Sequence, residues 1–266
     1  MKRALTVAVT LAAALIVVGL APAQTGDPHP DGNTHPNVGA LLAMRADGSL
    51  TITCTGTLVS RRVFLTAAHC SEAMISRGQS TAYVTFDSNF GTDSAHNVIA
   101  TPYHGTLYTN PNYKKPFQND TAIVLLDAPV TNIAPARIAP RHFLDGFSNK
   151  QLNATTYTNV GYGTSEQDVV KGVGPTFPFD GIRKWTISAF HSLDPGDIHL
   201  DQNLARGLSG TCYGDSGGPT FVDSASGPVV ISVVSTGDTP CYSTSVDQRV
   251  DTDGSHNFLE PFLALN

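Results

Sequence analysis

Short runs of β-branched, aliphatic and aromatic residues recur along most of the chain, and glycine, proline, asparagine or aspartate separates them. Residues 50–54 alternate between apolar and polar positions, which is the period of a half-buried strand. Four further runs, at 63–65, 82–86, 121–126 and 229–234, have the composition of strands. Long amphipathic helices do not alternate with these runs. The pattern therefore predicts antiparallel β-structure and argues against a parallel α/β sheet.

A proline-rich stretch at 128–147 reads as a linker between two β-rich halves. Each half has roughly 100 residues, which is enough for a small antiparallel barrel. One short helix is expected at the end of the chain, around 255–265. Pro261 should kink or interrupt this helix, because proline lacks the N–H group that a helical hydrogen bond needs.

The first residues have the organisation of a secretory signal peptide. Basic residues at 2–3 precede an uncharged run over 4–20, and Ala-Pro-Ala follows at 21–23. Cleavage after this site would remove 1–23, and the polar, proline-rich residues 24–36 would form an N-terminal arm. The alternative is an uncleaved membrane anchor, although the apolar run is short for a span of ~20 residues. We expect a secreted, extracellular protein with no membrane contact after cleavage.

The composition excludes several classes of protein. Hydrophobic residues make up 41% of the chain, which is enough for a sizeable core and argues against disorder. The net charge of −6 argues against a dedicated nucleic-acid partner.

Export to an oxidising compartment would allow the cysteines Cys54, Cys70, Cys212 and Cys241 to form two disulfides, in any of three pairings. No pair of cysteines is separated by only two residues, so we expect no metal site and no cofactor.

Glycines surround Ser216 in a way that suits nucleophilic catalysis. Gly214, Gly217 and Gly218 permit a tight turn and leave backbone N–H groups uncovered. A serine hydroxyl needs a base to remove its proton, and the oxyanion that forms needs N–H donors already directed at it. The segment therefore predicts a nucleophilic serine.

His69 and Asp120 are the candidates for the base and for the carboxylate that orients it. His69 lies in an apolar segment, and Asp120 stands directly before a strand-like run. The three residues occur in the order His, Asp, Ser, which differs from the order in subtilisins and in α/β-hydrolases. An α/β-hydrolase is a weak alternative, because His256 is the only histidine after Ser216.

With these three segments in view, the chain resembles the chymotrypsin-like serine peptidases of the trypsin/chymotrypsin family. The matching motifs are TAAHC at 66–70, DTAI at 120–123 and GDSGGP at 214–219. VGYG at 160–163 is similar to the family's Gly-Trp-Gly turn, and STG at 235–237 is similar to its Ser-Trp-Gly segment, with threonine in place of tryptophan. One such motif alone would be moderate evidence for this family, and three motifs in the family's order are strong evidence.

The resemblance covers roughly 37–265 and implies an all-β fold. It implies two antiparallel six-stranded β-barrels with the active site between them and a short C-terminal helix. The first barrel would comprise 37–130 and carry the histidine and the aspartate. The second would comprise 131–266 and carry the serine and the helix.

The resemblance also implies the role of each site residue. His69 would be the general base and then the general acid, Asp120 would orient it, and Ser216 would be the nucleophile. The N–H groups of Gly214 and Ser216 would form the oxyanion hole. Ser235 would hydrogen-bond near Asp120 and present its backbone to the substrate.

Among the three disulfide pairings, the resemblance supports Cys54–Cys70 and Cys212–Cys241.

The sequence departs from the family pattern at the partner of Asp215, which in the family pairs with a new N-terminal amine after activation. No Ile-Val-Gly-Gly sequence occurs at 24–45. Asp215 should therefore have another partner, or the arm should order this region.

The family pattern predicts an uncharged primary specificity pocket. Gly210 occupies the position of the pocket floor, so no aspartate is present to select Arg or Lys. Val234 occupies the position where glutamate-specific members have a histidine. We expect the pocket to take an apolar or aromatic side chain. The residues assigned to the pocket are Ser209, Gly210, Thr211, Ser235, Thr236 and Gly237.

The sequence thus predicts a secreted serine endopeptidase that forms an acyl-enzyme at Ser216. Its partners would be protein or peptide substrates and protein inhibitors, with no nucleic acid and no membrane, and it would be a monomer. The alternative is a catalytically inert secreted binding protein on a peptidase scaffold.

Overall fold

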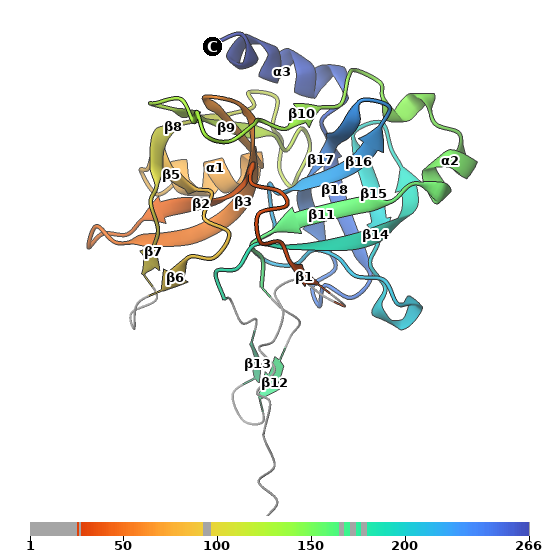
Figure 1. Ribbon diagram of the computed structural model, residues 1–266, viewed down its shortest axis with the longest axis horizontal. Helices are drawn as coiled ribbons and strands as arrows, with labels where there is room; N and C mark the ends of the chain where they lie inside the picture. Colours follow the sequence, from red (N-terminus) through yellow and green to blue (C-terminus); the bar gives the residue numbers. More distant parts are fainter. Residues whose placement is uncertain are drawn as a thin grey trace, which may run out of the picture.

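Two β-barrels lie side by side in the computed structural model, one formed by each half of the chain (Figure 1). The structure describes residues 26, 28–92, 97–164, 168–170, 174–176 and 180–265. The expected signal peptide, 1–23, lies outside these residues, as does part of the expected arm.

The first barrel is closed and contains six antiparallel strands. Each of its neighbouring strands is paired through backbone hydrogen bonds, and β2 pairs with β5 to complete the ring. Large apolar side chains such as Leu58 and Phe64 fill its interior. Gly56 is required beside Phe64, because a Cβ atom there would lie 2.4 Å from the ring. In barrel order the strands are β2 (Val38–Met44), β3 (Leu50–Ser60), β4 (Val63–Thr66), β9 (Ala122–Leu126), β8 (Tyr103–Thr109) and β5 (Thr81–Thr85).

The second barrel also contains six antiparallel strands and is closed by pairing between β14 and β15. Its interior has an apolar part, which includes Tyr157 and Ile231, and a polar part. The strands in order are β14 (Lys184–Leu193), β11 (Tyr157–Gly161), β16 (Pro219–Ser224), β17 (Gly227–Gly237), β18 (Thr244–Arg249) and β15 (Asp197–Asp201). The all-β fold with two six-stranded barrels is therefore confirmed, and each run predicted as a strand overlaps one.

Short elements decorate the two barrels. A two-residue strand, β1 (His29–Pro30), pairs with β14, and β10 (Arg137–Ile138) pairs in parallel with β17. The remaining elements are β6 (Gly91–Thr92), β7 (Val98–Ile99), β12 (Asp168–Val170), β13 (Gly174–Thr176), α1 (Ala68–Ile75), α2 (Asn149–Ala154), α3 (Asp253–Leu263) and the 3-10 turns η1 (Leu144–Gly146) and η2 (Leu204–Arg206).

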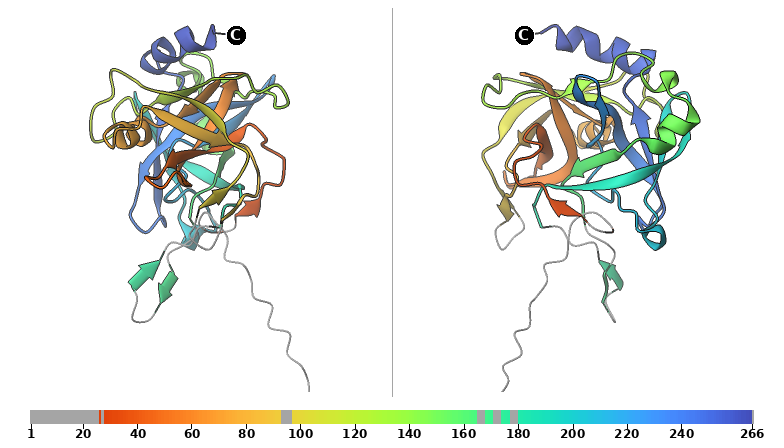
Figure 2. Two further views of the ribbon diagram at one scale, coloured as in Figure 1. Left: turned by 90° about the vertical axis from the view of Figure 1, so that its left-hand side faces the viewer. Right: turned by 45° about the vertical axis from the view of Figure 1, so that its right-hand side comes forward.

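Helix α3 lies across the top of the barrels in both views of Figure 2. Thr252 caps it, because its side chain accepts a hydrogen bond from the Ser255 N–H. The helix continues through Pro261, so this proline does not interrupt it. Pro261 lies in the last turn, where one missing hydrogen bond is tolerated because buried Leu259 and its apolar neighbours pack on the apolar core shared by the barrels.

The arm is anchored at the junction of the barrels by a fully buried ion pair. The Arg183 Nε atom lies 2.8 Å from Asp31 Oδ2, and both side chains are 0% exposed. The same guanidinium donates to the carbonyl groups of Val38 at 2.9 Å, Phe86 at 3.1 Å and Gly32 at 3.1 Å. Arg183 therefore connects the arm, the first barrel and the second barrel at one point. Within the described ranges, no helix is both long and apolar enough to cross a membrane.

Candidate active site

Strand pairing brings His69 and Asp120 together. His69 lies in the first turn of α1, directly after β4, and Asp120 lies just before β9. These two strands are antiparallel neighbours, and their last pair is Thr66 with Ala122. The end of β4 and the start of β9 therefore meet at the same edge of the first barrel. Ser216 is supplied by the second barrel, in the loop before β16.

Asp120 is fully buried and holds His69 at two points. The Asp120 Oδ2 atom lies 2.7 Å from His69 Nδ1, and Oδ1 accepts a 2.7 Å hydrogen bond from the His69 backbone N–H. The Ser235 hydroxyl donates to Oδ2 at 2.5 Å. The side-chain oxygen of Gln248 accepts from the Asp120 backbone N–H at 2.9 Å. This arrangement fixes the imidazole with its Nδ1 atom toward the carboxylate. The Nε2 atom lies 3.5 Å from the Cys70 Sγ atom, which carries no hydrogen because it is in a disulfide, so the Nε2 lone pair can accept a proton.

The loop around Ser216 has the backbone that its glycines suggested. Gly214 and Gly217 have positive φ angles of 97° and 79°. A Cβ atom at Gly217 would lie 2.2 Å from the Thr66 hydroxyl oxygen, so this position also needs glycine for space. Across the part of the chain that the structure describes, the N–H groups of Gly214 and Ser216 donate to no protein acceptor. Two uncommitted N–H donors on one loop can stabilise an oxyanion.

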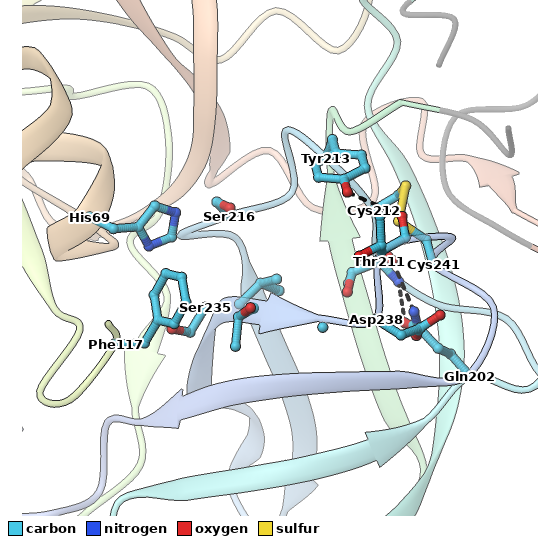
Figure 3. A pocket seen from close by; sticks show the side chains of 14 residues that line it. His69, Phe117, Gln202, Thr211, Cys212, Tyr213, Ser216, Ser235, Asp238 and Cys241 are labelled. Carbon is cyan, nitrogen blue, oxygen red and sulfur yellow. Dashed lines mark hydrogen bonds between the residues drawn. A yellow bond between two sulfur atoms is a disulfide. The ribbon is translucent and has the colours of Figure 1, made fainter. Parts of the chain in front are cut away.

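Figure 3 shows the His69 ring and Ser216 side by side at one end of a pocket. Among the described residues, no hydrogen bond joins His69 Nε2 to Ser216 Oγ. Such contacts are often long in unliganded enzymes and tighten when substrate binds. The neighbouring positions of the two side chains are compatible with proton transfer between them.

Asp215, beside Ser216, is fully buried. Its Oδ1 atom accepts from the Gly163 N–H at 2.9 Å, and its Oδ2 atom accepts from the Cys212 N–H at 2.9 Å. A Cβ atom at Gly163 would lie 2.2 Å from the carboxylate, so only glycine fits there. Asp215 therefore has backbone N–H groups as partners. The absence of an Ile-Val-Gly-Gly sequence led us to expect a partner other than a new N-terminal amine.

Two disulfides brace the site. Cys54 is bonded to Cys70, which ties β3 to α1 beside His69, and Cys212 is bonded to Cys241, which ties the segment before Ser216 to the loop after β17. This is the pairing that the family resemblance implies. Among the described residues, the one cluster with three candidate metal ligands consists of Cys54, Cys70 and His69. Because both sulfurs are in a disulfide, they lack the thiolate form that binds metals.

A cavity of about 370 Å³ extends from His69 and Ser216 along the second barrel. Of the six predicted pocket residues, Thr211, Ser235, Thr236 and Gly237 line this cavity, whereas Ser209 and Gly210 do not. The Ser209 hydroxyl turns away and donates to the Ile187 carbonyl at 3.2 Å. Gly210 is covered by another side chain, that of Gln202.

Five lining residues, Thr239 among them, were missed by the sequence reasoning. Phe117 packs edge-on to the His69 ring, with centroids 5.5 Å apart, and Tyr213 donates its hydroxyl hydrogen to the Thr239 carbonyl across the pocket rim at 3.1 Å. Gln202 and Asp238 complete the far end. The proximity of Phe117 to Asp120 and of Tyr213 to Ser216 in sequence could have suggested the first two. No local motif marks the others.

Asp238 carries a negative charge that the backbone neutralises in part. Burial acts to raise the pKa of Asp238, but the N–H groups of Thr244, Tyr242 and Ser243 lower it by a larger amount, so the net shift is downward. The donors lie in the loop that follows Asp238 and at the first residue of β18, so the carboxylate stabilises this connection.

Comparisons with known proteins agree with this arrangement. The family model for trypsin matches residues 26–253. The chain is 29% identical over 220 residues to an alkaline trypsin B of Manduca sexta, a match that covers 77% of each protein. It is 27% identical over 220 residues to a chymotrypsin of Phaedon cochleariae, over 80% of this chain and 73% of that protein.

A solved collagenase structure shares the fold. It superposes with a TM-score of 0.65 at 19% identity and covers 91% of this chain and 98% of its own. The match to the family model spans most of both barrels and all three segments of the candidate site. The chain therefore belongs to the trypsin family of chymotrypsin-like serine proteases.

Proposed function

We propose that this protein is a secreted serine endopeptidase that hydrolyses peptide bonds through an acyl-enzyme at Ser216. The observation that carries the proposal is the buried His69–Asp120 pair, joined at 2.7 Å, next to a serine loop with two uncommitted N–H donors. The charge-free N-terminal run and the two disulfides support secretion.

In the proposed mechanism, His69 Nε2 removes the hydroxyl proton of Ser216 as Oγ attacks the substrate carbonyl carbon. The N–H groups of Gly214 and Ser216 donate to the oxyanion of the tetrahedral intermediate. His69 then gives its proton to the leaving amine, and the acyl-enzyme remains. Water attacks the acyl group by the same route, with His69 again as the base. Asp120 stabilises the imidazolium in both steps.

Protein or peptide chains are the proposed substrates, and their cleavage needs no cofactor. The cavity beside Ser216 would hold the substrate side chain on the amino side of the cleaved bond, called P1 below. Gln202 and Thr211, which line the inner part of this cavity, are uncharged. Asp238, the charged side chain at this end, is bonded to three backbone N–H groups, which supports a preference for an uncharged P1 side chain. The protein would act as a monomer and would be open to protein inhibitors.

The test is the intact mass of the mature secreted protein before and after a fluorophosphonate probe. We expect a single adduct in the parent protein and none in Ser216→Ala, because the probe reacts with an activated serine. His69→Ala should slow the labelling by at least about a thousandfold. A parent protein that folds but takes no adduct would contradict the proposal and favour an inert binding protein. The mass before labelling also locates the mature N-terminus.

A further inference from the structure

Gln202 closes the end of the pocket that lies opposite His69 (Figure 3). It follows β15, and its backbone N–H donates to the Ser243 carbonyl at 2.9 Å, which attaches it to the loop of the second pocket wall. Its side chain is 1% exposed. Gln202 therefore forms a fixed floor, in the place where the family pattern assigned Gly210.

Two hydrogen bonds set the orientation of the Gln202 amide. Its Oε1 atom accepts from the Thr211 N–H at 2.9 Å, and its Nε2 atom donates to the Thr211 carbonyl at 3.2 Å. A Cβ atom at Gly210 would lie 2.1 Å from Oε1, so the amide packs directly against the glycine backbone. Neither a flip of the amide nor a larger residue at 210 is compatible with these contacts.

This clamp leaves a specific chemistry at the floor. A primary amide has two N–H hydrogens and two acceptor lone pairs, and Thr211 takes one of each. One donor and one acceptor remain, and neither has a formal charge. The remaining hydrogen and lone pair lie on the two outer sides of the amide and point away from each other, because Thr211 occupies the edge between Oε1 and Nε2. The remaining N–H calls for an uncharged acceptor, and the carbonyl oxygen of a second primary amide is such an acceptor.

Asp238 is the competing determinant, since its carboxylate is on the same cavity wall. Its Oδ1 atom accepts from the N–H groups of Ser243 at 3.0 Å and Thr244 at 2.7 Å, and its Oδ2 atom accepts from that of Tyr242 at 2.9 Å. Three of the roughly four acceptor positions of this carboxylate are thus occupied by backbone N–H groups. This favours the Gln202 amide over the Asp238 charge as the group that selects a substrate.

We propose that Gln202 is the specificity-determining residue of the pocket and that it selects peptides with a primary amide at P1, glutamine or asparagine. The inference rests on the proposed function and specifies its substrate class. An apolar side chain of equal length would leave the second Nε2 hydrogen without an acceptor after displacing water, and a P1 carboxylate would lose its hydration without a counter-charge. A P1 ammonium would meet only the Asp238 carboxylate, whose oxygens already accept three backbone hydrogen bonds.

The first test uses the mature protein and a set of peptides that differ only at P1. We expect kcat/KM for glutamine to exceed that for methionine, leucine, glutamate and lysine by at least about tenfold. Equal or faster cleavage after methionine or leucine would overturn the proposal. A preference for lysine or arginine would overturn it too, in favour of Asp238.

Variants at 202 then assign the selection to this residue. Gln202→Glu keeps an acceptor for the Thr211 N–H but places a second carboxylate oxygen against the Thr211 carbonyl oxygen. A cationic P1 side chain can donate hydrogens to these two oxygens, whereas a P1 glutamine is not charged. The lysine-to-glutamine ratio of kcat/KM should therefore rise by at least about tenfold. Gln202→Met should raise the methionine-to-glutamine ratio similarly. Gln151→Glu is the matched control, since this residue caps α2, where glutamate serves equally well, and its profile should not change.

Fluorophosphonate labelling separates the two levels of failure. Folded variants that take the adduct but keep the parent P1 profile would overturn the role of Gln202 alone. A parent protein that neither labels nor cleaves any peptide would overturn the proposed function and this inference with it. If the Gln202→Glu protein fails to fold, Gln202→Met and the parent profile still decide.

Discussion

Asp247 is a buried carboxyl group that the proposed chemistry does not use. It is fully buried in the second barrel, and the hydroxyl groups of Ser245, Thr220 and Ser232 surround it. Burial raises the pKa of Asp247, with these hydroxyls acting in the opposite direction. Burial thus disfavours the ionised form of Asp247 relative to its state in water.

A count of hydrogens supports the neutral form independently. The Thr220 hydroxyl oxygen lies 2.9 Å from Asn159 Oδ1 and 2.7 Å from Asp247 Oδ2, but it has only one hydrogen. The amide nitrogen of Asn159 faces the Ser188 hydroxyl at 2.7 Å, and that hydroxyl donates to a backbone carbonyl. With Asn159 in this orientation, a proton on Asp247 supplies the missing donor.

We predict that Asp247→Asn folds, keeps its activity and becomes more stable relative to the parent as the pH rises. Because burial raises the pKa of Asp247, the unfolded chain ionises this group at a lower pH than the folded chain does, so the group lowers parent stability above about pH 4. Between pH 4 and pH 8, urea unfolding should show the variant gaining at least about 1 kcal/mol relative to the parent. A difference that is constant with pH would contradict the assignment.

At the scale of elements, the arm is attached to the barrels mainly through one ion pair. Asp31 receives the Arg183 guanidinium at 2.8 Å, and its other oxygen lies 2.5 Å from His35 Nδ1. Burial acts to raise the pKa of Asp31, but hydrogen bonds from His35 and Arg183 produce a net lowering. A buried pair of this kind is costly to break because the remaining charge has no partner.

We predict that Asp31→Asn lowers the free energy of unfolding by about 3–5 kcal/mol at pH 7. Because the pKa of Asp31 is lowered, the parent loses this contribution as the pH falls below about 4, so the two proteins should converge in acid. Asp127→Asn is the control, since its pair with His104 is exposed and should contribute less than about 1 kcal/mol. A loss in Asp31→Asn no larger than in the control would show that the arm is held by other contacts.

The elements also show where sequence reasoning succeeds and where it stops. The β-runs are recognisable because their residues alternate or are β-branched, and Ser216 and His69 stand in local motifs. Gln202 has no such local signal: it reaches Thr211, nine positions away, only because β15, the following turn and the serine loop fold against one another. The position of Gly210 in its motif likewise does not reveal that the Gln202 side chain covers it.

At the scale of the whole molecule, Thr55 of the first barrel fixes the position of the loop that carries Ser216 in the second barrel. Its hydroxyl donates to the Gly214 carbonyl at 2.8 Å and accepts from the Tyr162 N–H at 3.1 Å. Its backbone N–H donates to the Ser216 carbonyl at 2.9 Å. The loop with the proposed nucleophile is thus positioned by a residue of β3.

We predict that Thr55→Val lowers kcat/KM by at least about tenfold and the free energy of unfolding by about 1–3 kcal/mol, because it leaves two buried backbone groups of the second barrel without a partner. Thr57→Val is the matched control on the same strand, since the buried Thr57 hydroxyl has no partner among the described residues. The control should keep full activity and stability. Equal losses in both variants would point to packing instead of the hydroxyl contacts.

Each end of the described chain packs against the barrel that the other half of the chain forms. The segment that leads into the first barrel packs on the second, where His29 stacks on Trp185, with the ring centroids 4.5 Å apart. The helix that ends the second barrel returns to the first, where Phe262 contacts Tyr108 with the centroids 5.0 Å apart. A hinge-like separation of the barrels would have to detach both ends at once. We therefore expect the two barrels to keep their relative position when a substrate binds. The substrate would then adapt its own conformation to the cleft, and the barrels would not open.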